Sequence, residues 1–302
     1  MELIKNTKID FIGKRYYAFV FSAILALVGI VAVVLIPMGK ANLGIDFTGG
    51  VAIQLKFEKP FVLENARTIL DKDGFKDTEL QQFAGNNRLL IRLKKTEGEL
   101  KITSDKITEV FIKEFADNKF IIESTTAVGP TVGQKLQKDA LWAVGISLLG
   151  ILIYVAWRFE LIFGIAAVIA TFHDVLAVLG VFYVLNKEIN LLIITALLTL
   201  AGYSLTDTVV VFDRIRENLR KRGKEVIEDI INRSINEVLS RTVVTSGTTL
   251  LVLIALLIAG GEVIHDFSLA LFLGVLVGTY SSIFVASPLL LLWKGKRGRL
   301  IR

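Results

Sequence analysis

An aspartate lies inside an apolar stretch of this sequence, at Asp207 within Leu197–Phe212. The residues from Asn190 onward are apolar and numerous enough to cross a bilayer. A carboxyl group in hydrocarbon costs at least a few kcal/mol unless it is paired, neutralised or hydrated. Asp207 is therefore the first candidate for a functional residue, and the rest of the chain must show what it does.

A cation follows at the start of the next apolar block. Asp207 is expected roughly 8 Å from the end of its own span, and Arg241 approaches from the same side, so its long side chain can reach the carboxylate. The pKa of a carboxyl depends on where a nearby cation lies, so moving Arg241 would change the proton affinity of Asp207. The alternatives are a static pair that stabilises helix packing, or an arginine that reaches lipid headgroups.

Three further polar residues, the adjacent His173 and Asp174 and the separate Asp213, are also candidates. His173 and Asp174 fall near the middle of another apolar block. Adjacent helical residues face about 100° apart, so at least one should point into the bundle. The pair is either part of a polar path toward Asp207 or a local hydrogen-bonded pair that fixes helix contacts. Asp213, beside Arg214, is either a proton entrance or part of a solvated interface.

Composition places the chain among polytopic membrane proteins. It has 302 residues, 53% of them hydrophobic, and a mean hydropathy of +0.60. It contains no cysteine and only two histidines, so we expect no disulfide, no metal site and no cofactor. Gly129–Lys135 is one residue short of a phosphate-binding loop, which argues against an ATPase. Because the six basic charges in excess gather beside apolar blocks, they indicate membrane orientation and not nucleic-acid binding.

Six blocks are long enough to span a membrane. They cover residues 17–37, 140–157, 161–185, 190–212, 243–260 and 267–293. The first follows basic residues as a signal peptide does, but no cleavage pattern follows Pro37, so it is interpreted as a retained helix. Lys and Arg number four before the first span, eight in residues 213–242 and five after the last span. The chain is therefore predicted to be a multi-pass protein of the cytoplasmic membrane. Both termini and segment 213–242 are predicted to lie in the cytoplasm.

The predicted domains are residues 1–38, a cytoplasmic N-terminus with the first helix; 39–139, an extracytoplasmic domain; and 140–302, a five-helix membrane domain. Strands and helices in the outer domain follow the order β-α-β-β-α-β, which is typical of a ferredoxin-like α+β fold. A hairpin is expected around Gly85–Asn87. Segment 214–241 is expected to form one or two amphipathic helices on the interface, or a solvated connecting helix. Gly274 and Gly278 form a GxxxG, expected to serve helix packing.

Several motifs, in order along the chain, resemble a known family. Gly44-Ile45-Asp46-Phe47-Thr48-Gly49-Gly50 looks like the G-I-D-F-x-G-G signature of the SecD and SecF export proteins, and Val128–Gly133 is similar to the family's V-G-P-x-V-G. The SecF branch of the family has a further set of sequence motifs. This chain resembles that set at Gly202–Asn218, Ser234–Asn236, Leu239–Thr242 and Gly278–Phe284. Where this branch usually has Asn before the aspartate, the chain has Thr206, whose hydroxyl retains the ability to form hydrogen bonds.

The resemblance implies a membrane subunit of resistance-nodulation-division architecture. It implies SecD as a separate partner, the SecYEG channel and the translocating preprotein as further partners, and use of the proton gradient for export. Asp207 and Arg241 match the family's fourth-span aspartate and fifth-span arginine. Gly44, Asp46, Gly49 and Gly50 mark the start of the outer domain, where the glycines serve tight backbone geometry or a substrate contact.

Two other functions remain open. A proton-driven half-transporter for a small molecule or lipid predicts a larger outer domain and a substrate-sized pocket. A structural assembly subunit predicts that Asp207 and Arg241 can be neutralised without loss of function. For all three functions, including protein export, the protein is expected to make no covalent bonds and not to be an enzyme.

The topology generates the first prediction. Single cysteines introduced as Lys101→Cys and Arg222→Cys should differ in labelling by an impermeant maleimide, because the chain has no thiol of its own. Lys101→Cys should react in intact cells, and Arg222→Cys only after the membrane is permeabilised. Labelling of Arg222→Cys alone in intact cells would reverse the orientation.

Overall fold

The computed structural model describes residues 7–36, 38–75, 78–83, 87–94, 100–221 and 225–293 of the chain. It divides into two compact units. One, here called the α+β unit, is Leu43–Leu141; the other, the membrane unit, joins Met1–Asn42 to Trp142–Arg302. Each unit has its own apolar core.

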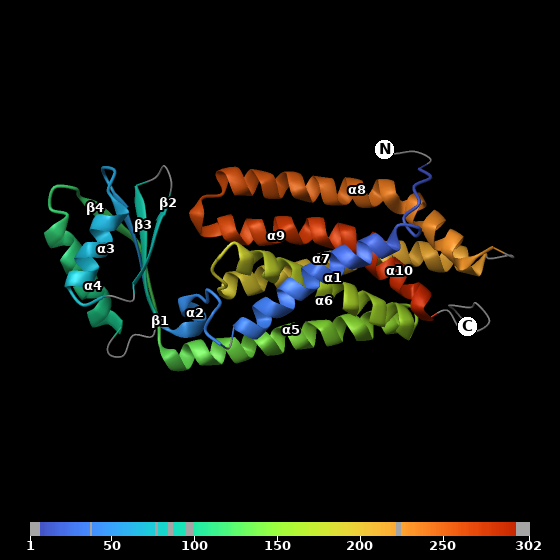
Figure 1. Cartoon of the computed structure of the whole chain (residues 1–302), viewed down its shortest axis with the longest axis horizontal. Coiled ribbons are helices and arrows are strands. Elements are labelled where there is room, and N and C mark those ends of the chain that lie inside the picture. The colour runs from blue at the N-terminus through green and yellow to red at the C-terminus, as the bar shows by residue number, and fades with distance from the viewer. Residues whose placement is uncertain are drawn as a thin grey trace. The chain divides into compact units, whose positions relative to one another are not determined.

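The α+β unit has the predicted ferredoxin-like fold. Its elements are a short helix α2 (Ile45–Thr48), β1 (Gly50–Phe57), α3 (Leu63–Lys72), β2 (Thr78–Phe83), β3 (Arg88–Lys94), α4 (Leu100–Glu114) and β4 (Phe120–Val128). The strands form one antiparallel sheet in the order β2-β3-β1-β4, and α3 and α4 cover one of its faces (Figure 1). The pairing of Phe83 with Arg88 confirms the β2–β3 hairpin, although residues 84–86 of its turn lie outside the described residues.

Alternation along β1 explains how the sheet and helices hold together. Val51, Ile53, Leu55 and Phe57 are buried and pack on α3 and α4, whereas the residues between them are more exposed. Ile53 lies opposite Ile91 of β3, and this register keeps the apolar residues of both strands on the helix-covered face.

The glycines of the first signature are required by backbone geometry. Gly49 and Gly50 have φ of +73° and +137°, values that side chains rarely adopt. A Cβ on Gly50 would lie 2.1 Å from the carbonyl oxygen of Leu93, and one on Gly49 would lie 2.9 Å from Cα of Pro130. Gly44 precedes α2 as its N-cap residue, and Asp46 lies in the first turn of that helix.

The second signature packs against the first. A Cβ on Gly133 would lie 2.9 Å from the carbonyl oxygen of Phe47, and Gln137 donates a hydrogen bond of 3.1 Å to the same oxygen. Val128 pairs with Gly50 in the sheet. The two motifs, far apart in the sequence, therefore form one tightly packed junction, which favours backbone geometry over a substrate contact as the reason for the glycines.

The six predicted spans are present, and all of them lie in the membrane unit except for the start of the second, which belongs to the α+β unit. They are α1 (Arg15–Leu35), α5 (Pro130–Arg158), α6 (Leu161–Val184), α7 (Leu191–Arg220), α8 (Ile227–Ala259) and a last span over Ile264–Leu292. This last span begins with α9 (Glu262–Ser281) and continues through a π-helical turn (Ser282–Ala286), α10 (Ser287–Leu289) and a 3₁₀ turn (Leu290–Trp293). Side chains of α6 are the most buried of the six, and those of α5 the least, so α6 lies at the centre of the unit.

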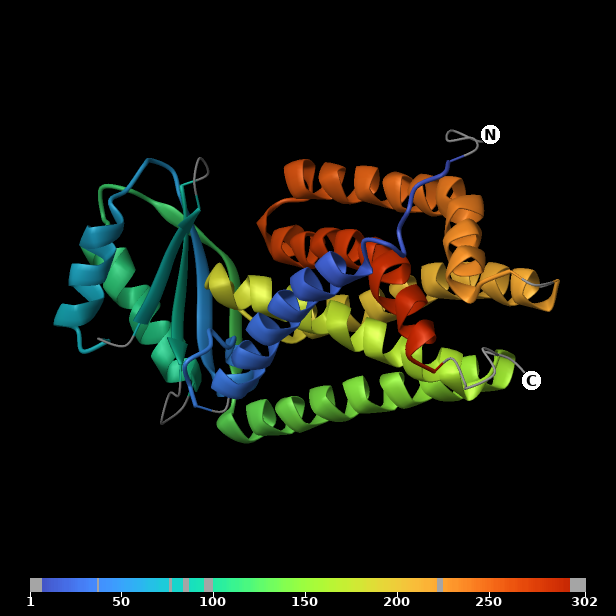
Figure 2. The same ribbon diagram turned by 45° about the vertical axis from the view of Figure 1, so that its right-hand side comes forward.

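Segment 214–241 differs from both expectations, which were amphipathic helices on the interface or a solvated connecting helix. It is not a separate helix, because α7 continues to Arg220 and α8 already begins at Ile227. Most of its apolar residues, including Ile215 and Ile231, are buried in the core of the membrane unit, whereas Val226 is exposed. Figures 1 and 2 show that α8 changes direction between its first turns and the part that runs beside α9.

The residues before α1 hold the start of α8 in place. The amide of Phe11 donates to Oδ1 of Asn232 at 2.8 Å, and the amide of Ile9 donates to Oδ1 of Asn236 at 3.0 Å. Both asparagines also donate to the carbonyl of Ile9. Asn232 and Asn236 are one turn apart and therefore lie on one face of α8. This face binds the backbone of the residues before α1.

The tight glycine junction generates the second prediction. Residues 42–130 should fold without the membrane helices, because the α+β unit has its own core. In that fragment Gly50→Ala should lower the free energy of unfolding by more than about 2 kcal/mol, since the backbone of β3 must move. Gly74→Ala, with φ of +87° and open space around it, should cost only about 1 kcal/mol of strain. Chemical denaturation measures both; equal losses would contradict the packing argument.

Candidate functional site

Helix α7 presents three of its polar residues on one buried face. Ser204, Asp207 and Thr208 lie three and four positions apart, so they share a side of the helix. Asp207 is 8% exposed. Its Oδ1 accepts a hydrogen bond of 2.8 Å from Oγ1 of Thr242 on α8, and its Oδ2 accepts one of 2.5 Å from Oγ of Ser282 in the π-helical turn. Asp207 thus joins three segments of the membrane unit.

A second buried carboxyl is held in the same manner. Asp174 on α6 is completely buried. Its Oδ2 accepts hydrogen bonds from Ser204 at 2.6 Å and Ser281 at 2.8 Å, and its Oδ1 lies 3.0 Å from Nδ1 of His173. The adjacent pair expected from the sequence is therefore present, and Asp174 also ties α6 to α7 and α9.

The two carboxyls have neighbouring partners. Ser204 and Asp207 are one turn apart on α7, and Ser281 and Ser282 are consecutive. Among the described residues no hydrogen bond joins Asp174 directly to Asp207, so the structure brings them into one polar layer without linking them. Nε2 of His173 is buried and has no hydrogen-bond partner in that part of the chain.

Small residues allow the helices to come this close. A Cβ on Gly278 of α9 would lie 3.1 Å from Cβ of Ser204, and one on Gly274 would lie 2.5 Å from Cδ2 of Leu200. The GxxxG therefore packs α9 against α7 inside this chain, as expected from its spacing. This approach is what places Ser204 and Ser281 on the same carboxylate oxygen.

The last span is irregular where it meets Asp207. The π-helical turn starts at Ser282, and Pro288 follows it. Proline cannot donate to the preceding turn, and single π-helical turns are frequent at functional sites. Ser287 donates to the carbonyl of Ser282 at 2.7 Å, so the irregular turn keeps this buried carbonyl satisfied while the Ser282 side chain faces Asp207.

The two serines can serve either protonation state of the carboxyls. The Ser282 hydroxyl lies within hydrogen-bond distance of Asp207 and of the Thr279 carbonyl at 3.0 Å; the Ser281 hydroxyl lies near Asp174 and the Gly278 carbonyl at 3.1 Å. A hydroxyl has one hydrogen and two lone pairs. It can donate to a carboxylate, or it can turn to the helix carbonyl and accept from a protonated carboxyl. Neither state leaves the carboxyl oxygen atoms or these serine hydroxyls without a partner.

Arg241 does not pair with Asp207 as the sequence suggested. Its side chain is exposed, and within the described residues it forms no ion pair, although its charge is close enough to act on Asp207 through space. The reason is rotational: Thr242, the next residue on α8, faces Asp207, and consecutive side chains point about 100° apart. Thr206 is turned away for the same reason, and its hydroxyl donates to the Gly202 carbonyl at 3.0 Å.

Asp213 lies apart from the buried carboxyls. It is exposed and pairs with Arg158 at 3.3 Å. Sequence analysis did not assign roles to Thr242, Ser204, Ser281 and Ser282, although all four occur in motifs noted for the family resemblance. A usable signal was their type, because hydroxyls in otherwise apolar helices seek buried partners. No group of three metal-ligating side chains converges within the described ranges.

The fold and this site define a class: a six-span membrane protein with a buried, hydroxyl-lined carboxyl pair and one ferredoxin-like α+β unit. The family model described as "Protein export membrane protein SecD/SecF, C-terminal" matches residues 107–296, and the "SecD/SecF GG Motif" matches residues 35–61. The protein translocase subunit SecF of Thermodesulfovibrio yellowstonii is 53% identical over 97% of both chains. That of Calditerrivibrio nitroreducens is 46% identical over 99% of both chains.

A solved structure is also similar. The crystal structure of SecDF, a translocon-associated membrane protein from Thermus thermophilus, matches with a TM-score of 0.85 and 38% identity over 97% of this chain. The chain covers 40% of the length of that SecDF chain. This chain belongs to the SecD/SecF family, and within the family it matches the SecF translocase subunits over nearly their whole length.

The buried hydroxyls generate the third prediction. Ser204→Ala removes one donor to Asp174 and should lower the free energy of unfolding by about 1–3 kcal/mol, because the carboxyl is inaccessible to water. Thr199→Val is the matched control on the same helix, since its exposed hydroxyl bonds only to its own helix at the Thr195 carbonyl. Unfolding of the full chain in detergent, followed by intrinsic fluorescence, measures both variants. Equal losses would show that the buried layer is not a stabilising element.

Proposed function

We propose that this protein is the SecF subunit that couples the proton gradient to preprotein export across the cytoplasmic membrane, together with SecD. It works by transport and conformational change, without making bonds. The observation that carries the proposal is Asp207, a buried carboxyl whose hydroxyl partners suit both its protonated and its ionised form. A group of that kind can take up and release a proton without a large penalty for unsatisfied polar atoms.

The gradient is a sufficient energy source. One elementary charge that crosses a potential of 100 mV releases about 2.3 kcal/mol. This is comparable to the free energy that separates two packings of a helix bundle, so proton uptake can bias one packing over another. In the proposal, Asp207 binds the proton, and α7, α8 and the π-helical turn respond because all three contact its carboxyl group.

In this proposal, Arg241 modulates the proton affinity of Asp207. Its positive charge acts on Asp207 through space but is not fixed by an ion pair in the described part of the chain. Arg241 and Thr242 are consecutive on α8, so a rotation or shift of this helix moves the cation and the hydroxyl together. A change in their distance from Asp207 changes its proton affinity. His173 and Asp174 extend the polar layer and are proposed as part of the path, whereas Thr206 and Asp213 lie on its outer side.

The proposed setting follows the topology and the relatives. Both termini, the C-terminal end of α7 and the N-terminal end of α8 lie in the cytoplasm, and the α+β unit lies outside. The partners are SecD, SecYEG, the emerging preprotein and membrane lipids. The similarity to the SecDF crystal structure supports SecD as a partner. The rival of a structural assembly subunit makes an opposite prediction for the charges at Asp207 and Arg241, and that difference can be measured.

The fourth prediction separates these two functions. Asp207→Asn keeps volume and hydrogen bonding but removes the proton site, so the complex with SecD should assemble while export loses its gradient-dependent part. Asp139→Asn, at an exposed position on α5, is the matched control and should export normally. Preprotein transport into vesicles that contain the translocase, with and without an imposed gradient, is the measurement.

The double variant Asp207→Asn with Arg241→Gln sharpens the test. If the two residues only balance charge, removing both should restore much of the export lost in either single variant. If protons must bind and leave Asp207, the double variant stays inactive although the complex is intact. Recovery to near wild-type export would contradict the proposed function.

A further inference from the structure

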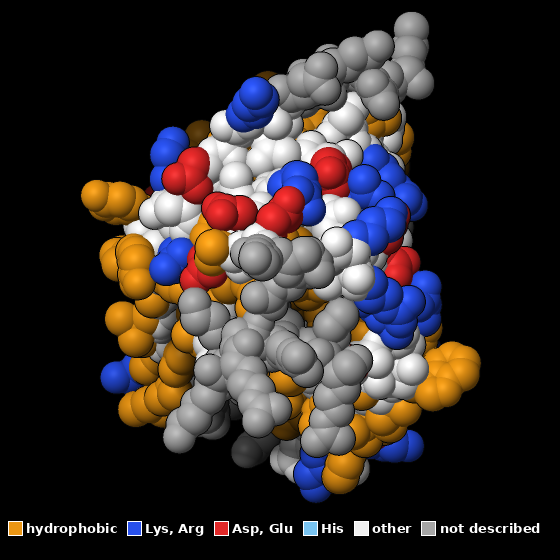
Figure 3. Space-filling view, turned by 90° about the vertical axis from the view of Figure 1, so that its right-hand side faces the viewer, with side chains coloured by type: hydrophobic (Ala, Val, Ile, Leu, Met, Phe, Trp, Pro, Cys, Tyr) orange, Lys and Arg blue, Asp and Glu red, His pale blue; other side chains and the backbone are white. Residues whose placement is uncertain are grey.

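A cationic cavity lies beside the ends of α5, α7 and α8 in the membrane unit. It has a volume of about 550 Å³. Its basic lining residues are Arg158, Arg214, Arg216, Arg220, Lys221 and Arg241. Of the residues that the structure describes, only Asp213 and Glu217 add acidic side chains to its lining. Figure 3 looks onto this end of the molecule and shows Lys and Arg gathering along one side of it.

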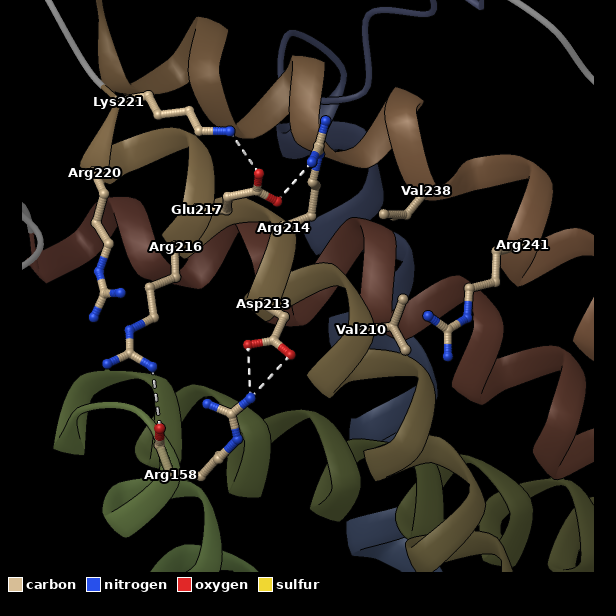
Figure 4. Close-up of a pocket in the computed structure, with 10 residues that line it drawn as sticks. All are labelled: Arg158, Val210, Asp213, Arg214, Arg216, Glu217, Arg220, Lys221, Val238 and Arg241. Carbon is tan, nitrogen blue, oxygen red and sulfur yellow. Dashed lines mark hydrogen bonds and ion pairs between the residues drawn. The ribbon is translucent and has the colours of Figure 1, made fainter.

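Ion pairs use up only part of this positive charge. Asp213 pairs with Arg158, and Glu217 pairs with Arg214 and Lys221. Arg216, Arg220 and Arg241 have no carboxylate partner among the described residues; Arg216 donates only to the backbone carbonyl of Arg158 at 3.2 Å. In Figure 4, Arg216 and Arg220 reach in the same direction, and Arg241 lies on the other side of Asp213 and Val210. The cavity therefore presents guanidinium groups that are available to an anion.

A second, less charged cavity continues from the first. It has a volume of about 330 Å³ and shares Val210, Asp213 and Arg241 with the cationic one. Its other lining residues are Tyr154, Leu205, Thr206 and Val209, which lie further into the apolar parts of α5 and α7. A polar chamber joined to an apolar one, in helices that cross a membrane, matches the two halves of a phospholipid.

We propose that these joined cavities bind one anionic phospholipid, with its phosphodiester headgroup at Arg216 and Arg220 and an acyl chain along Leu205 and Val209. Guanidinium groups suit phosphate oxygens because their donors form a fork that matches them. Basic pockets between membrane helices are a recognised way of binding anionic headgroups. A free phosphate would use only the cationic chamber, so the apolar chamber is what favours a lipid.

The site lies next to the group that the transport proposal uses. Arg241 lines both cavities, and its charge also acts on Asp207. A lipid that occupies both cavities would therefore lie beside this guanidinium. The inference does not depend on export activity, because binding of the lipid is measured directly.

The test uses the full chain, purified in a neutral detergent and examined by native mass spectrometry. Added phosphatidylglycerol should be retained, and phosphatidylcholine with the same acyl chains should not. Arg216→Gln with Arg220→Gln should lower the affinity for phosphatidylglycerol about tenfold or more, because two headgroup contacts are lost. Lys135→Gln with Lys138→Gln removes the same charge from exposed positions near the other end of α5 and should leave retention unchanged.

Two further arms address the apolar chamber and the source of the phosphate. Val210→Phe narrows the junction of the cavities without changing charge and should also reduce retention; the melting temperature of each variant checks that it is folded. Inorganic phosphate should not displace the lipid at millimolar concentration. Displacement by phosphate, equal retention of both lipids, or unchanged binding in the Arg216 and Arg220 double variant would each overturn the proposal.

Discussion

The carboxyl groups of Asp174 and Asp207 must obtain their hydrogen bonds from the protein itself, because the helices that carry them cross an environment without water. A buried carboxyl that lacks partners costs several kcal/mol. Hydroxyl groups from three neighbouring segments meet this demand, and each of them has to arrive at one oxygen atom within about 3 Å. This requirement constrains how α6, α7, α8 and the last span are oriented, which the apolar contacts around it do not do because they are not directional.

Small residues and an irregular turn make that geometry possible. Gly278 lets α9 approach Ser204, which brings Ser281 to Asp174. The π-helical turn then carries Ser282 to Asp207, one position further along the chain. Polar pairing and close packing are therefore one feature, since a larger side chain at Gly278 would separate the hydroxyls from their acceptors.

The same feature connects chemistry to movement. In the proposed function, proton uptake would reverse the direction of the hydrogen bond between Asp207 and Ser282 and change the charge that Arg241 experiences. Since Thr242 and Arg241 are neighbours on α8, the helix that satisfies the carboxyl also carries the cation that modulates it. The N-terminal residues bound to Asn232 and Asn236 hold the start of this helix, so hydrogen bonds join α8 to the segment before α1. The cationic cavity at the ends of α7 and α8 places any anion that binds there beside the same arginine.

The sequence by itself determined the features that depend on local composition. The six spans follow from long apolar blocks, the ferredoxin-like unit follows from alternating strands and their order, and Asp207 stands out because a carboxylate is rare in such a block. The family motifs indicated where the important turns lie. These signals are local along the chain, so no knowledge of packing is needed to read them.

Only the tertiary structure decided which side chains meet. The partner of Asp207 is Thr242 and not Arg241, because the rotation of α8 about its own axis is set by its contacts with α7 and α9, and one residue of difference turns a side chain by about 100°. The partners of Asp174 come from residues 204 and 281, and the two glycine motifs of the α+β unit meet across more than seventy residues. Hydropathy reports how deeply a helix is buried but carries no information on its rotation, and that rotation decides which hydroxyl reaches which carboxyl.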